Sequence, residues 1–122
     1  MKHLIFIVFL AVLSCSSTHD KIKQGKILFN KSHLGANNVI GCIACHSLKP
    51  DILTVGPSLY KIKLRAGLLI ENQTAEQYIR QSIINPDAYI VSGYMPAIMF
   101  AHYQTELTAT EIQQLVAFLL TQ

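Results

Sequence analysis

The sequence predicts a single small all-α domain, on three observations. The chain has 122 residues, of which 51% are hydrophobic and 14% are charged, and this balance is typical of one folded domain rather than a disordered chain. Three segments place apolar residues at helical spacing. No alternating apolar pattern is long enough to build a sheet.

The first residues are predicted to be a targeting segment rather than part of the fold. Lys2 and His3 give a short, potentially positive start, and ten unbroken apolar residues follow from Leu4 to Leu13. This layout is typical of a secretory signal. The stretch from Val12 to Cys15 also resembles the lipobox of bacterial lipoproteins, in which the cysteine is acylated after cleavage.

We therefore expect residues 1–14 to be a signal peptide, 15–19 to be a lipidated N-terminus with a short linker, and 20–122 to be the domain. A simple secretory signal with an incidental Cys15 is the alternative. Both readings place the domain on the periplasmic side, outside the cytoplasm, and lipidation of Cys15 would anchor it to a membrane.

The first predicted helix runs from Asp20 to about Ser32, with Thr18 or Asp20 as its N-cap. A second helix follows the capping box Thr74-Ala75-Glu76-Gln77 and ends at Asn85-Pro86. A third helix follows the capping box that opens at Thr108 and runs almost to the C-terminus. Its apolar stripe consists of Ile112, Leu115, Val116 and Leu119.

Long connections separate these helices, at residues 35–41, 50–57 and 89–103. A compact domain normally uses such long loops only when they line a site. The ten Lys and Arg residues against seven Asp and Glu are too few and too scattered for the dense basic face of a nucleic-acid-binding protein. Nucleic acid is therefore excluded as a partner.

The chemistry is concentrated in Cys42-Ile43-Ala44-Cys45-His46. This is the C-x-x-C-H arrangement of c-type haem attachment, in which both thiols bond to the macrocycle and the adjacent histidine binds the iron. A thioredoxin-like redox pair would need a βαβ context, and a structural zinc site would need four ligands. A plain disulfide would leave His46 unexplained. The motif therefore predicts one covalently attached haem c per chain.

On these residues the chain resembles the single-haem class I c-type cytochromes of bacteria, over nearly all of the sequence after the signal. The resemblance implies the small cytochrome c fold, with three main helices and long loops wrapped around one haem. Gly25 and Phe29, with Leu115 and Phe118, resemble the crossed N- and C-terminal helices of that family. Gly56-Pro57 resembles the loop whose proline carbonyl accepts a hydrogen bond from the haem-ligating histidine.

The resemblance also implies a methionine as the second axial ligand of the iron. Met99 lies eight residues before Leu107, within a segment that opens with Gly93-Tyr94, and this spacing fits the family frame. Phe100 departs from that frame, because proline is usual after the ligand. Met95 is followed by Pro96 but comes four residues earlier, so it remains an alternative, as does His102.

Several further residues are expected around the haem. Arg65 or Tyr60 is expected to reach a propionate, and Lys49, Lys61, Lys63 and Arg65 are expected to form a positive rim that steers toward an acidic partner. The expected apolar wall consists of Tyr60, Tyr94, Ile98, Leu64 and Leu53.

The resemblance implies an electron-transfer protein that carries one electron on a His/Met-ligated haem c in an extracytoplasmic respiratory or redox chain. It implies no enzyme and no small-molecule substrate, since ligands on both faces leave no open position on the iron. Redox proteins are the expected, transient donors and acceptors. The alternatives are a haem-based sensor that binds small ligands and a haem subunit fixed in a larger oxidase or dehydrogenase complex.

Overall fold

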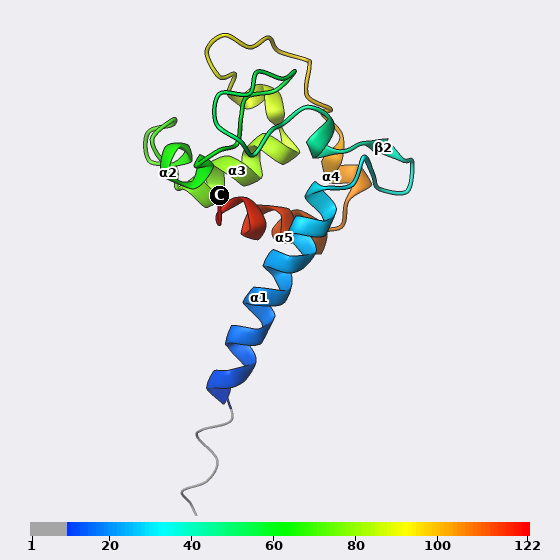
Figure 1. The fold of residues 1–122 in the computed structure, drawn as a ribbon, viewed down its shortest axis with the longest axis vertical. Helices are drawn as coiled ribbons and strands as arrows, with labels where there is room; N and C mark the ends of the chain where they lie inside the picture. The colour runs from blue at the N-terminus through cyan, green and yellow to red at the C-terminus, as the bar shows by residue number, and fades with distance from the viewer. Residues whose placement is uncertain (1–9) are drawn as a thin grey trace, which may run out of the picture.

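The computed structural model describes residues 10–122, and the side chains of residues 17–122 (Figure 1). Most of the predicted signal peptide therefore lies outside the described residues. The described chain is mostly helical, with one two-stranded sheet. The prediction of an all-α fold is confirmed. None of the described helices is long and apolar enough to cross a membrane.

The first helix, α1 (Leu10–Phe29), projects well beyond the rest of the fold at its N-terminal end (Figure 1). Its predicted start at Thr18 or Asp20 is wrong, because the helix continues through both residues. Its predicted end at Ser32 is also wrong. The backbone N–H of Lys31 donates to the carbonyl oxygen of Leu28 at 3.1 Å, three residues back rather than four, and the Asn30 side-chain amide donates to the carbonyl oxygen of Lys26 at 2.8 Å, which satisfies one of the last helical acceptors.

The C-terminal helix, α5 (Ala109–Leu119), crosses α1 as predicted. A Cβ atom added at Gly25 would lie 1.8 Å from the backbone oxygen of Gln114 and 2.8 Å from Cβ of Phe118. Only glycine therefore allows the two helices to approach this closely. Beside this crossing the rings of Phe29 and Phe118 pack with their centroids 5.6 Å apart.

Both predicted capping boxes are confirmed. Helix α3 (Ala75–Ile84) begins after Thr74, and Asn85 is its C-cap, as the predicted stop at Asn85-Pro86 requires. The Thr74 hydroxyl accepts from the Gln77 backbone N–H, and the Gln77 side chain accepts from the Thr74 N–H. Thr108 and Glu111 make the same exchange at the start of α5. Each box satisfies two backbone donors that the first helical turn leaves unpaired.

Several shorter elements lie between the predicted helices. Strands β1 (His33–Leu34) and β2 (Val39–Ile40) pair antiparallel and lead into the 3₁₀ helix η1 (Cys42–Ala44). The short helix α2 (Ile62–Ala66) precedes α3, the 3₁₀ helix η2 (Pro86–Ala88) follows it, and α4 (Tyr103–Glu106) precedes α5. None of these elements is predicted from the sequence.

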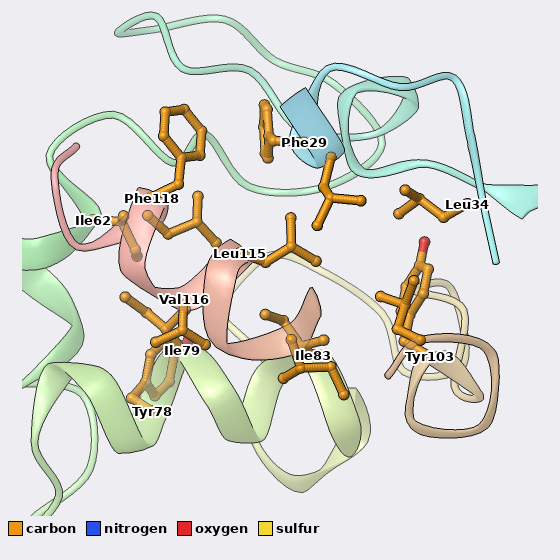
Figure 2. Packing of buried hydrophobic residues seen from close by; sticks show 14 of the residues in the cluster. Phe29, Leu34, Ile62, Tyr78, Ile79, Ile83, Tyr103, Leu115, Val116 and Phe118 are labelled. Atoms are coloured by element: carbon orange, nitrogen blue, oxygen red, sulfur yellow. The ribbon is translucent and has the colours of Figure 1, made fainter. Parts of the chain in front are cut away.

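The hydrophobic core lies between α1, α3 and α5, with contributions from β1, α2 and α4 (Figure 2). Phe29 and Leu115 are its largest fully buried side chains. The predicted stripe of α5 is buried in full: Ile112, Leu115, Val116 and Leu119. This core forms one side of a cavity, and the loops between the helices form much of the rest of its wall.

Candidate functional site

A cavity of about 580 Å³ lies among the loops and the core helices. Its wall includes both cysteines and the histidine of the C-x-x-C-H motif, together with residues 55–59. One face of α3 and most of the loop between η2 and α4 also belong to the wall. The predicted site residues Cys42, Cys45, His46, Pro57, Tyr94 and Met99 all line this one cavity. Segments that are far apart in the sequence therefore meet at a single site.

The two cysteines are presented by η1, a single tight turn. The backbone N–H groups of Cys45 and His46 both donate to the carbonyl oxygen of Cys42, at 3.1 and 3.0 Å. Both thiols are free rather than joined in a disulfide. Burial raises the pKa of the Cys42 thiol to about 11, so this group is protonated at neutral pH and remains available for thioether formation.

His46 is held in one orientation by its neighbours. Its Nδ1 lies 2.8 Å from the carbonyl oxygen of Pro57. Because a carbonyl oxygen only accepts, Nδ1 carries the proton and Nε2 keeps its lone pair. Burial lowers the pKa of His46 below its ordinary value of 6.5, against an opposing effect of the Pro57 carbonyl. The imidazole is therefore neutral at neutral pH, which is the form that binds a metal.

Gly56 packs directly against the imidazole of His46. A Cβ atom at this position would lie 2.5 Å from Cε1 and 2.8 Å from Nδ1 of the ring. The Gly56 N–H also donates to the Cys45 carbonyl at 2.8 Å, and the Thr54 hydroxyl donates to the same oxygen at 2.7 Å. The loop that carries Pro57 is thus bound to the motif that carries His46.

The two candidate methionines differ in their surroundings. Met99 is partly buried and packs against the hydrophobic core. Met95 also borders the cavity, but 69% of its surface is exposed. His102 borders the cavity with its side chain exposed, and its ring contacts Phe100 with the centroids 5.7 Å apart.

The predicted wall is only partly correct. Tyr94 and Ile98 line the cavity, whereas Tyr60, Leu64 and Leu53 do not. Leu64 and Leu53 are 66% and 91% exposed. Leu64 lies in α2, whose buried residues are Ile62 and Ala66, and Leu53 lies between η1 and α2, outside any helix or strand. Apolar character alone did not indicate which way these side chains face.

Of the four predicted rim cations, only Arg65 lines the cavity. Its guanidinium donates to the carbonyl oxygens of Ser58 and Tyr60, at 2.7 and 3.1 Å. The Tyr60 side chain lies outside the cavity, so of the two residues predicted to reach a propionate only Arg65 borders the space.

Sequence reasoning missed the contribution of α3 to the site. Tyr78, Ser82 and Ile83 line the cavity, and burial raises the pKa of Tyr78. The available signal was Ser82, a polar residue on the otherwise apolar face of the predicted helix. Ser82 donates to the carbonyl oxygen of Tyr78 at 3.0 Å, which satisfies its hydroxyl within the helix.

These residues fit a haem. The cavity is within the range of cofactor sites, and it combines free thiols, a neutral imidazole with an available Nε2, and apolar walls. Arg65 places a cation in the cavity wall, and a cation there can pair with a propionate of the haem. Among the described residues no group of three or more His, Cys, Asp and Glu side chains could hold a metal ion by itself.

The fold and the site define a small helical protein that encloses one covalently attached haem. The family model of cytochrome c matches residues 22–122, and the chain belongs to the cytochrome c family. Searches of curated proteins and of solved structures found no match. The family binds haem c through two thioether bonds, Cys42 and Cys45 fit its attachment motif, and the function of the family is electron transfer.

Proposed function

We propose that this protein is an extracytoplasmic electron carrier of a respiratory or redox chain, with His46 and Met99 as the axial ligands of its haem iron. The observation that carries the proposal is the cavity itself. It joins the attachment thiols, an imidazole whose tautomer is fixed by Pro57, and a methionine packed against the core.

Two axial protein ligands leave no position on the iron for oxygen, peroxide or a substrate, which favours electron exchange through the haem edge. The chain contributes fixed ligands and an apolar environment. A thioether ligand raises the reduction potential compared with more electron-rich ligand pairs. Donor and acceptor are then redox proteins that dock briefly, as is typical of such encounters.

The optical spectrum of the holoprotein tests the ligand assignment. We expect a low-spin haem c with the weak sulfur-to-iron band at the red end of the oxidised spectrum. This band should disappear in Met99→Ala and persist in Met95→Ala, which removes a matched thioether from the same loop. Loss of the band only in Met95→Ala would move the ligand to Met95. A high-spin wild type that readily binds carbon monoxide would favour a sensor instead.

We also propose that the chain is a lipoprotein anchored through Cys15. The support is the sequence pattern from Leu4 to Cys15, together with helix α1, whose N-terminal end projects beyond the rest of the fold (Figure 1). Labelled palmitate should be incorporated into the wild type and not into Cys15→Ser, which should be released from membranes. Equal membrane retention of both proteins would contradict the lipid anchor.

A further inference from the structure

The loop that carries Met99 has almost no regular structure of its own. Between η2 and α4, residues 89–102 contain no helix or strand. Residues 94–95 and 97–103 nevertheless line the cavity. The backbone N–H of Tyr94 donates to the Val91 carbonyl at 3.0 Å near the start of this loop, and loops with so few internal hydrogen bonds open easily unless other groups hold them in place.

One such group is the side chain of Asp87, in η2. Its Oδ1 accepts the backbone N–H of Ala97 at 2.9 Å. This is the only hydrogen bond of residues 95–101 in the described part of the chain. Ala97 has a φ of +58°, in the left-handed region that an alanine adopts at a cost. The Asp87 carboxylate thus holds a strained backbone two residues before Met99.

A second group holds the chain on the other side of Met99. The hydroxyl of Tyr103, four residues after Met99, donates to the carbonyl oxygen of Ile40 at 2.6 Å. Tyr103 is only 4% exposed, and Figure 2 shows its hydroxyl directed toward the segment of Leu34. Its ring packs against Phe100 with the centroids 5.0 Å apart. Ile40 lies two residues before Cys42, so this bond joins the loop to the haem-attachment segment.

We propose that Asp87 and Tyr103 are positioning residues that hold the chain on either side of Met99, at Ala97 and at Tyr103, and thereby keep the Met99 sulfur on the iron. The inference rests on the proposed ligand role of Met99. Asp87 connects the loop to the end of α3, and Tyr103 connects it to the strand that leads into the C-x-x-C-H motif. Neither residue has to touch the iron to act in this way.

The consequence is that a ligand added from solution competes with Met99 for the iron, and this competition can be measured. A ligand from solution binds the iron only when the loop has moved away, so its apparent affinity is proportional to the open fraction. A hydrogen bond of this kind contributes about 0.5–1.5 kcal/mol, which corresponds to roughly a two- to twelvefold change in an equilibrium. Removing one tether should raise the apparent affinity by this factor.

The experiment is an imidazole titration of the oxidised holoprotein, followed by loss of the sulfur-to-iron band. We expect Asp87→Ala and Tyr103→Phe each to bind imidazole roughly two- to twelvefold more tightly than the wild type. Asp87→Asn keeps an oxygen acceptor at the same place and should fall between Asp87→Ala and the wild type. Tyr103→Phe keeps the ring contact with Phe100 and removes only the hydroxyl.

Glu111→Ala is the matched control. It also removes a carboxylate that accepts a backbone N–H, that of Thr108 at 2.8 Å, but at the start of α5 rather than in the loop. It should lower the unfolding temperature without raising the imidazole affinity. Imidazole affinities of Asp87→Ala and Tyr103→Phe equal to that of Glu111→Ala would overturn the tether proposal. Retention of the band in Met99→Ala would instead overturn the ligand assignment, so the two failures are distinguishable.

Discussion

At the scale of single residues, the environment of His46 explains why glycine and proline follow the haem motif by about ten residues. Pro57 supplies a carbonyl at 2.8 Å from Nδ1, and the absence of a side chain at Gly56 lets this carbonyl come so close. Without that contact either ring nitrogen could carry the proton. The pair therefore selects the tautomer whose Nε2 is available to the iron.

Gly56→Ala should consequently damage the site. The added methyl would overlap the imidazole at 2.5 Å, so the ring must move and its hydrogen bond to Pro57 must lengthen. Overpacking of this kind costs about 1–3 kcal/mol. We expect a lower free energy of unfolding for the holoprotein, measured by denaturant titration, together with a change in the haem spectrum.

Gly67→Ala is the control for this substitution. The nearest atom to a Cβ at Gly67 is the Ala75 nitrogen at 3.4 Å, and the backbone there is helical, with φ −74° and ψ −2°. Alanine at such a position is neutral or stabilises by about 0.4–1 kcal/mol. If Gly56→Ala were as stable as Gly67→Ala, with an unchanged spectrum, the packing argument for Gly56 would be refuted.

At the scale of elements, the parts that sequence predicted best are those with a local signal. The capping boxes at Thr74 and Thr108 fixed the starts of α3 and α5, because both partners of each box lie within four residues. The crossing of α1 and α5 followed from the resemblance at Gly25 and Phe118. The cavity-lining positions of Cys42, Cys45 and His46 followed from one motif.

The remaining elements depend on distant partners and carried no such signal. Helix α4 is four residues long, too short to show a period, and Tyr103 at its start bonds to Ile40, which is 63 residues away in the sequence. In the sequence, Asp87 is an ordinary turn residue. Its hydrogen bond with Ala97, ten residues later, is visible only in the structure. The prediction that Leu53 and Leu64 line the cavity is wrong for a related reason. The apolar character of a side chain does not determine which way that side chain faces.

At the scale of the whole molecule, the haem cavity is a large part of the interior. The core of α1, α3 and α5 forms one side of it, and buried residues such as Phe29, Ile79 and Leu115 line the cavity while also packing in that core. Without haem, the apolar side chains that line this cavity of about 580 Å³ have no packing partners on their cavity side, and the dispersion contacts that they would make are lost. Domains are stable by only about 5–15 kcal/mol, so the loss of these contacts weighs heavily in a chain of this size.

The chain without haem should therefore lack a cooperative fold. We expect Cys42→Ala/Cys45→Ala, purified free of haem, to show reduced helical circular dichroism and no sharp thermal transition, whereas the holoprotein unfolds cooperatively. Because His46 and the apolar walls remain in this variant, adding haem should restore helical signal without a covalent bond. Native helical content and a sharp transition in the haem-free chain would mean that packing among α1, α3 and α5 suffices. The haem would then occupy a preformed cavity rather than complete the core.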